Sequence, residues 1–120
     1  MRKIEERMVE AVRPGRSFSL GNTRVTAIKK NGDGTGSAGV YLHGNLIAVM
    51  TWEYRAGIIT KYPHELARVD CTLAGWGTVT TRSRLNALSR GLGKGTRFSQ
   101  SKHRQMFDDR EISTNQWVTL

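Results

Sequence analysis

The sequence predicts an α+β fold: a twisted antiparallel sheet of five to six strands, one packed helix and a separate N-terminal helix. Apolar residues recur at helical spacing in residues 2–13 and 82–91, whereas much of the remaining chain alternates apolar and polar residues as strands do. Thirteen glycines among 120 residues indicate many turns. A chain of this length is expected to form a single domain over residues 1–120, with a β-rich core over 16–120 and the N-terminal helix as an appendage.

The N-terminal helix is predicted from an apolar stripe that faces away from charged residues. The stripe consists of Ile4, Met8, Val9, Ala11 and Val12. Pro14 and Gly15 then end the helix. An amphipathic terminal helix usually packs on its own domain or on a symmetry mate.

Turn residues divide the first half of the chain into short strands. Gly21 and Asn22 follow a strand that contains Phe18 and Leu20, and residues 30–37 form a loop without the carboxylate spacing of a calcium site. Strands at 40–43 and 46–52 flank a tight turn, His43-Gly44-Asn45, because Gly and Asn tolerate a positive φ.

The second half is expected to contain a helix over about 82–91, with Thr81 or Ser83 as its N-cap and a buried leucine stripe. A short strand is predicted at Ile58 and Ile59, and another over residues 68–73. After the helix, strands are predicted at Phe98–Gln100 and at the edge of the sheet over 116–120, with 102–115 mobile.

The formal charge of +9 is concentrated in one stretch, because no acidic residue occurs from Cys71 to Phe107. The cations of this window are Arg82, Arg84, Arg90, Lys94, Arg97, Lys102 and Arg104. A continuous positive field attracts polyanions by counterion release without contacts to particular bases. The alternative is a solvated basic face that has no dedicated ligand.

The start of the 82–91 helix combines hydroxyl groups with arginines. Four hydroxyls come from Thr78, Thr80, Thr81 and Ser83. Free backbone N–H groups at a helix start favour an anion, which arginine can bind in bidentate fashion, so this motif is a candidate phosphate site. The alternative is that the threonines only cap the helix while the arginines face water. No Walker motif is present, so nucleotide hydrolysis is unsupported.

Helical geometry separates these side chains. Arg82 and Arg84 lie about 200° apart and should face different ways. Ser83, Asn86 and Arg90 share one side, which is the side we expect to touch nucleic acid. Asn86 would bond a base edge or, as the more common outcome, only backbone or water.

Other chemistry is weakly indicated. Trp76, between two glycines, is interpreted as a core anchor, with a stacking platform for an unpaired base as the alternative. Cys71 lies in an apolar segment and is interpreted as inert core, and no disulfide can form within a chain that has one cysteine. The histidines do not occur at metal-binding spacing. The sequence therefore predicts no enzyme, metal or cofactor.

Three segments in this order carry a resemblance: residues 40–48 (VYLHGNLIA), 75–88 (GWGTVTTRSRLNAL) and 98–102 (FSQSK). Together they resemble a family of small, uncharacterised tailed-bacteriophage proteins, in which an LHGN-x-IA hairpin precedes a W-x-T-x-TT-x-S-R-L-N-A-L helix start. The resemblance covers residues 23–120, and 2–13 and 53–66 are additions. It implies a phage origin and a role in host takeover or counter-defence. An acidic detour between Lys102 and Trp117 departs from the pattern and leaves the register of the last strand open.

The function expected from these features is that of a small, basic, non-enzymatic phage protein in the host cytoplasm. It would bind nucleic acid, or a host complex that carries nucleic acid. The candidate binding residues are Trp76, Thr80, Thr81, Arg82, Ser83, Arg84, Asn86, Arg90, Lys94, Arg97, Lys102 and Arg104.

Two other functions remain open. The first is an inhibitor of a host defence enzyme, anti-CRISPR-like or similar, that docks by electrostatics. The second is a binder of a small anionic signalling nucleotide. The longest apolar run, residues 46–50, is too short to span a bilayer, so no membrane partner is expected. A homodimer is compatible with the apolar fraction of 38%.

Overall fold

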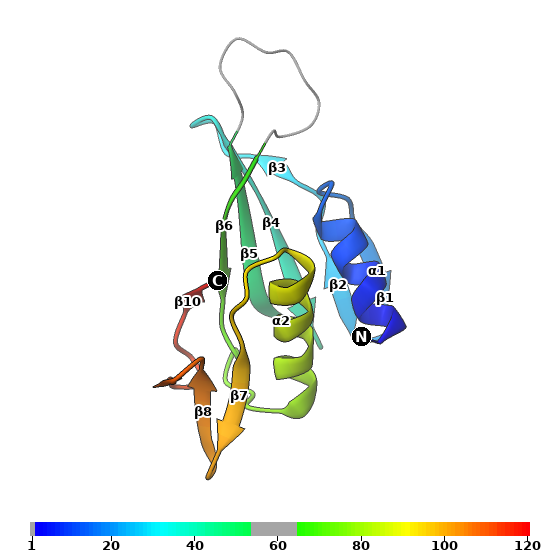
Figure 1. Cartoon of the computed structure of the whole chain (residues 1–120). Helices are drawn as coiled ribbons and strands as arrows, with labels where there is room; N and C mark the ends of the chain where they lie inside the picture. The colour runs from blue at the N-terminus through cyan, green and yellow to red at the C-terminus, as the bar shows by residue number, and fades with distance from the viewer. Residues whose placement is uncertain (1, 54–64) are drawn as a thin grey trace.

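The centre of the molecule is an antiparallel sheet (Figure 1). The computed structural model describes residues 2–53 and 65–120, and within these residues the sheet has seven strands in the order β1-β2-β4-β5-β6-β10, with β3 paired to β4. The strands are β1 Phe18–Leu20, β2 Thr23–Val25, β3 Lys29–Lys30, β4 Thr35–Leu42, β5 Asn45–Glu53, β6 Glu65–Cys71 and β10 Val118–Thr119. The expected α+β fold is confirmed.

Two helices, α1 (Lys3–Val12) and α2 (Val79–Gly91), cover one face of this sheet (Figure 1). Their apolar sides meet the sheet in one hydrophobic cluster, in which Met8 and Val12 of α1 and Leu85 and Leu88 of α2 are fully buried. Helix α1 therefore contributes to the same core as the sheet, rather than lying outside it as an appendage.

A second, three-stranded sheet lies beside α2. Its strands are β7 Phe98–Ser101, β8 Arg104–Phe107 and β9 Arg110–Glu111. Phe98 and Phe107 face each other across β7 and β8, with ring centroids 5.0 Å apart. The prediction that residues 102–115 are mobile is therefore wrong for β8 and β9, which are paired strands.

The turn between β4 and β5 contains two residues of positive φ, His43 at 51° and Gly44 at 79°. Positive φ at both central positions is the pattern of a type I′ turn, which is one of the two common turns of two-residue hairpins. The predicted hairpin is confirmed, but Asn45 is the first residue of β5 rather than part of the turn. Histidine is one of the few non-glycine residue types that adopt this conformation with any frequency.

Helix α2 starts earlier than the sequence predicted. Thr78 is the N-cap, and its hydroxyl oxygen accepts a hydrogen bond from the backbone N–H of Thr81 at 3.2 Å. Neither Thr81 nor Ser83 caps the helix, because both lie within its first two turns. The leucine stripe of α2 indicates a helix but does not fix the residue at which the extended backbone before it ends.

The remaining strand predictions have mixed outcomes. The turn at Gly21 and Asn22 joins β1 to β2, and β10 pairs with β6 at the edge of the sheet as expected. The predicted loop over 30–37 is shorter than expected, because β4 begins at Thr35. The strand predicted at Ile58 and Ile59 lies outside the described residues.

Gly91 allows α1 to pack closely against the end of α2. A Cβ atom at Gly91 would lie 2.5 Å from Cγ1 and 3.2 Å from Cβ of Val9, which is a buried residue of α1. We expect Gly91→Ala to destabilise the protein by about 1–3 kcal/mol through overpacking, although alanine is ordinarily the better helix former. Urea unfolding would measure the change.

The matched control for this substitution is Val9→Ala in the Gly91→Ala background. Removal of the two Val9 methyl groups should make the combined loss smaller than the sum of the single losses. Additive losses, or a more stable Gly91→Ala protein, would contradict a steric role for Gly91.

Candidate functional site

Arg84, a predicted anion contact, lies inside the protein with 4% of its surface exposed. Its Nη1 atom forms an ion pair with Oε2 of Glu5 at 3.0 Å, and its Nε atom donates to the hydroxyl of Thr23 at 3.0 Å. Its Nη2 atom lies 3.4 Å from Oδ1 of Asn22. The guanidinium thus joins α2 to α1 and β2 and is not accessible to an external anion.

The predicted nucleic-acid side of α2 is also largely used inside the protein. Ser83 donates its hydroxyl hydrogen to Oε2 of Glu5 at 2.6 Å. The side-chain amide of Asn86 donates to the carbonyl of Phe98 at 2.8 Å and accepts from its N–H at 2.7 Å. Of the three residues predicted to share this side, only Arg90 remains exposed.

Arg82 points away from Arg84, as the helical geometry predicted. Its Nη1 atom donates to the carbonyl of Gly77 at 2.9 Å and to Oε1 of Gln105 at 3.0 Å. These bonds connect the start of α2 to strand β8. Arg82 is half-buried, and its bonds show that it connects parts of the fold.

The remaining five cations of the acid-free window reach solvent. They are Arg90, Lys94, Arg97, Lys102 and Arg104, of which Lys94 is half-exposed. In space this surface is not free of acids, because Arg104 lies 4.0 Å from Glu111 and the backbone N–H of Arg97 donates to Asp108. Residues 90–111 still hold six Lys or Arg against three Asp or Glu, a local net charge of +3.

Two of these arginines border the same depression on the surface. Arg90 and Arg97 line a hollow of about 440 Å³ together with Asn86, Ser89, Gly95 and Thr96. Its floor is fixed by Ser89, whose hydroxyl donates to the carbonyl of Thr96 at 2.7 Å. Within the described part of the chain, neither Arg90 nor Arg97 forms an ion pair.

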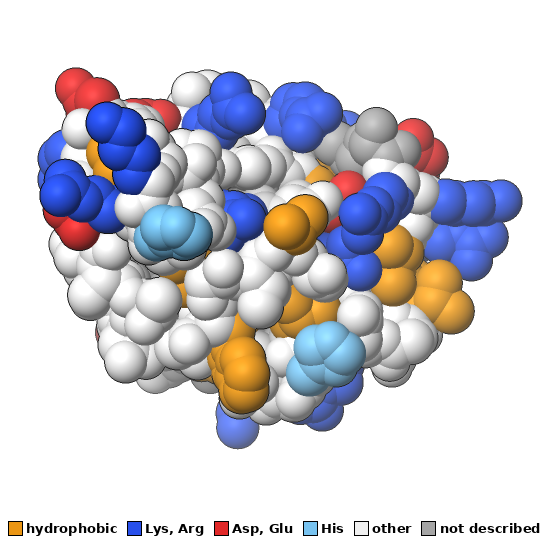
Figure 2. Space-filling model, turned by 90° about the horizontal axis from the view of Figure 1, so that it is seen from below, with side chains coloured by type: hydrophobic (Ala, Val, Ile, Leu, Met, Phe, Trp, Pro, Cys, Tyr) orange, Lys and Arg blue, Asp and Glu red, His pale blue; other side chains and the backbone are white. Residues whose placement is uncertain are grey.

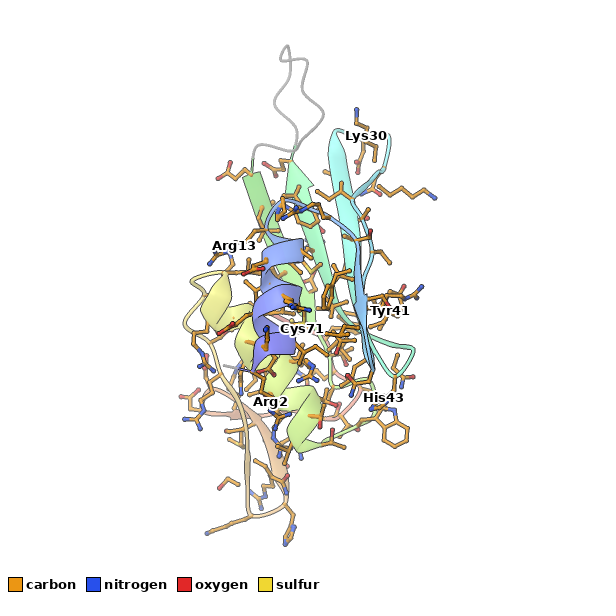
Figure 3. All side chains as sticks on the ribbon, turned by 90° about the vertical axis from the view of Figure 1, so that its right-hand side faces the viewer. Arg2, Arg13, Lys30, Tyr41, His43 and Cys71 are labelled. Carbon is orange, nitrogen blue, oxygen red and sulfur yellow. The ribbon has the colours of Figure 1, made fainter. Side chains whose placement is uncertain are left out.

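A further arginine, which the sequence did not indicate, lies next to this surface at the end of α1. Arg13 lies at the C-terminal end of α1, and its Nε atom donates to the carbonyl of Gly91 at 3.2 Å (Figure 3). The bond holds a cation beside the negative end of the α2 dipole. Arg13 and Arg90 are thus held near the same helix end, although they are 77 positions apart, and no local pattern in the sequence signals this.

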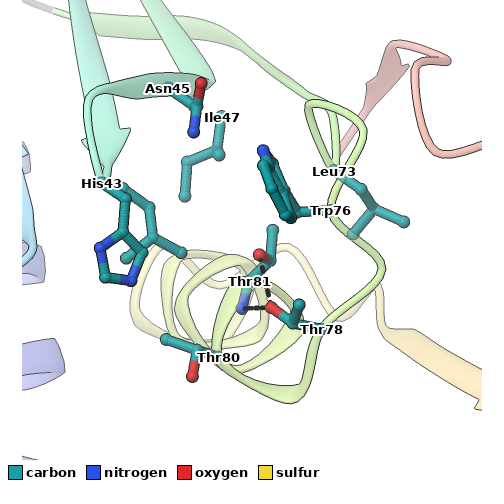
Figure 4. A pocket seen from close by; sticks show the side chains of 9 residues that line it. His43, Asn45, Ile47, Leu73, Trp76, Thr78, Thr80 and Thr81 are labelled. Atoms are coloured by element: carbon teal, nitrogen blue, oxygen red, sulfur yellow. Dashed lines mark hydrogen bonds between the residues drawn. The ribbon is translucent and has the colours of Figure 1, made fainter.

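A separate pocket of about 420 Å³ lies at the other end of α2, between that helix and the β4–β5 hairpin (Figure 4). It is lined by Leu42, His43, Asn45, Ile47, Leu73, Trp76, Thr78, Thr80 and Thr81. Three of these, Trp76, Thr80 and Thr81, are predicted site residues, whereas His43 and Asn45 were not selected. None of the nine is Lys or Arg.

Trp76 is 58% exposed at the rim of this pocket, so its interpretation as a core anchor is wrong. The hydroxyls of Thr78 and Thr81 lie 2.9 Å apart and bond to each other. Figure 2, which views this end of the molecule from below, shows Lys and Arg side chains mainly around the rim and uncharged side chains in the middle. The structure thus separates a basic surface from an uncharged pocket.

The described residues offer no metal-binding cluster. Over residues 2–53 and 65–120, no three His, Cys, Asp or Glu side chains are grouped as metal ligands. Cys71 is fully buried, as expected, and burial together with the nearby charge of Asp70 raises the pKa of its thiol. In the same part of the chain, no helix has the length and apolar character needed to cross a membrane.

Comparison with known protein families identifies a match over almost the whole chain. The family model described as Kyanoviridae Gp96 protein matches residues 1–119. The match includes residues 2–13 and 53–66, which the resemblance seen in the sequence had left out as additions. No curated protein and no solved structure matches the chain.

Proposed function

This chain belongs to the Kyanoviridae Gp96 family of bacteriophage proteins, and we propose that it binds nucleic acid, or a host complex that carries nucleic acid, through an exposed basic surface. This surface consists of Arg90, Lys94, Arg97, Lys102 and Arg104. The proposed place of action is the cytoplasm of the infected host cell, in host takeover or counter-defence.

The hollow between Arg90 and Arg97 is the observation that carries this proposal. Both arginines are exposed, and within the described residues neither has an acidic ion-pair partner. A guanidinium is suited to a phosphate because its N–H groups match two phosphate oxygens at once. Two such groups beside one depression provide a place for a backbone phosphate, and Lys94 adds charge next to it.

The geometry favours backbone contacts over recognition of bases. The side-chain amide of Asn86 is hydrogen-bonded to the backbone of Phe98, and the hydroxyl of Ser83 is hydrogen-bonded to Glu5. Neither group is therefore free to bond a base edge. Contacts to phosphates position a protein on nucleic acid but carry no sequence information directly. The proposed binding is therefore strong at low salt and tolerant of sequence.

The salt dependence of binding tests this proposal. Each phosphate neutralised on duplex DNA contributes a slope of about −0.9 in log affinity against log salt, so five contacts predict a loss of about 500-fold between about 50 and 200 mM salt. We expect Arg90→Glu with Arg97→Glu to leave about three contacts, for which the same salt change costs about 40-fold. Fluorescence anisotropy with labelled single- and double-stranded oligonucleotides would measure both.

The control is Arg16→Glu with Lys29→Glu, which makes the same change in net charge at two exposed cations outside the acid-free window. Its salt slope should match that of the unmodified protein. Equal effects of the two double variants would show that only net charge matters. If the unmodified protein does not bind at the lower salt, the nucleic-acid proposal fails, and the basic surface becomes a candidate for docking to an acidic host protein.

A further inference from the structure

The pocket between α2 and the β4–β5 hairpin has the features of a site for a small flat ligand. Its volume of about 420 Å³ lies within the range of about 300–1,000 Å³ that is usual for small-molecule sites. Leu42, Ile47 and Leu73 form an apolar interior. In Figure 4, His43 and Trp76 stand on opposite sides of the pocket, with Ile47 and Thr81 between them. We propose that this pocket binds a nucleobase, carried by a nucleoside or nucleotide, with its ring against Trp76.

The exposure of Trp76 is the first support for this proposal. An indole is large and apolar, and 58% of its surface faces solvent at the rim of the pocket. Exposed aromatic rings beside a cavity are typical of surfaces that stack a partner, because every base presents a π face. Gly75 and Gly77 flank Trp76 in the sequence, so its two chain neighbours carry no side chain that could cover the ring.

The side chain of Asn45 is the second support, and it selects a base over a purely apolar occupant. Its carboxamide makes no hydrogen bond to the described residues, and Figure 4 shows its nitrogen directed toward the space between His43 and Trp76. An amide presents a donor and an acceptor side by side, which matches the edge of a base. An aliphatic occupant would bury this group unpaired, which is unfavourable.

His43 adds a second polar group on the opposite side. Its Nε2 atom lies 3.5 Å from the side-chain nitrogen of Asn22, and an amide nitrogen can only donate. The contact therefore uses Nε2 of His43 as the acceptor and holds the imidazole ring beside Asn22 at the edge of the pocket.

Because the pocket is lined by no Lys or Arg, we expect it to recognise the base of a nucleotide rather than its phosphate. None of the nine residues that line it is Lys or Arg, so a phosphate has no side-chain cation to meet there. We therefore expect a nucleoside and its monophosphate to bind with similar affinity. This separates the pocket from the basic surface, and the inference does not depend on the proposed binding of nucleic acid.

Nuclear magnetic resonance of the tryptophan side chains tests this inference directly. The chain has three tryptophans, and Trp76→Phe and Trp117→Phe would assign the indole N–H signals. Adenosine, guanosine, cytidine and uridine are the probes, because they carry no charge. We expect at least one nucleoside to shift the Trp76 signal saturably at submillimolar concentration, and to leave the Trp117 signal in place.

Two substitutions then check the contacts. Trp76→Ala should weaken binding at least tenfold, whereas Trp117→Ala, at a tryptophan that is 48% exposed and does not line the pocket, should not change it. Asn45→Leu should weaken binding and reduce the preference among bases. The Arg90→Glu and Arg97→Glu variant should bind nucleosides normally, so failure of the basic surface leaves this result intact.

Three outcomes would overturn the inference. One is the absence of saturable binding for all four nucleosides, and another is an equal effect of Trp76→Ala and Trp117→Ala. The third is much tighter binding of the monophosphate than of the nucleoside, with loss of that preference in Arg90→Glu and Arg97→Glu. That result would place the ligand on the basic surface rather than in the pocket.

Discussion

Replacement of Arg84 by Met is expected to lower the free energy of unfolding by about 3–5 kcal/mol, because it leaves the buried carboxylate of Glu5 without its ion-pair partner. Glu5 is 3% exposed, and its Oε2 atom also accepts the hydrogen bond from Ser83. One hydroxyl cannot replace a guanidinium beside a buried charge. Urea unfolding followed by circular dichroism would measure the loss.

Two controls separate the ion pair from other effects. Arg90→Met changes an exposed arginine of the same helix and should alter stability by less than about 0.5 kcal/mol. Glu5→Leu combined with Arg84→Met removes both charges and should recover a large part of the loss, because a buried pair adds little over apolar groups of similar volume. If the double variant is as unstable as Arg84→Met, the unpaired charge is not the cause.

Phe98→Ala is expected to cost a similar amount, about 3–5 kcal/mol, through the cavity left by a buried aromatic ring. Phe98 is 2% exposed and pairs with Phe107, which is 4% exposed. The two rings lie where the small sheet meets α2, and the backbone of Phe98 is bonded there by Asn86. Loss of the ring should therefore loosen the small sheet from the helix as well as reduce overall stability.

The comparison is Phe18→Ala on β1, where the ring is only partly buried. Its loss should be clearly smaller, because less apolar surface leaves the core. Hydrogen exchange adds a local test, since amides of β7 and β8 should exchange faster in Phe98→Ala than those of β4 and β5. Equal losses in both variants would show that the aromatic pair has no special role in attaching the small sheet.

Local sequence patterns were sufficient to predict both helices and the hairpin turn between β4 and β5. The apolar stripe of α1, the leucines of α2 and the His43-Gly44 turn depend on neighbours within a few residues, and each was placed near its observed position. The start of α2 and the strands after Lys102 were placed less well. A cap depends on where extended backbone ends, and β8 and β9 are short strands whose pairing gives no strong periodic signal.

The predicted site depended on contacts that no local pattern contains. Arg84 and Glu5 are 79 residues apart in the chain, so the sequence showed a surface arginine where the fold buries an ion pair. For Trp76 the error is the reverse, because the sequence predicts a buried side chain and the fold exposes it. Tryptophan is usually buried, and the flanking glycines do not indicate its exposure. A single sequence shows which groups are present, but not which of them meet.

The charge along the acid-free window, residues 71–107, also differs from the charge on the folded surface. Antiparallel pairing of β7 with β8 brings Asp108 to the backbone of Arg97, although the two residues are 11 positions apart in the sequence. A charge run along the chain therefore overestimates the uniformity of the field that a ligand meets. What remains is a surface of net positive charge whose least compensated part is the end of α2.

The bond network around Arg84 also sets an order of events during synthesis. Glu5 is synthesised 78 residues before Ser83 and 79 residues before Arg84, which are its partners on α2. Until then α1 has no place to bury its carboxylate, and the apolar residues beside it stay uncovered. Contacts of such long separation fold slowly, and exposed apolar surface invites aggregation during the delay. The nascent chain is thus expected to depend on chaperones until residue 91 has emerged.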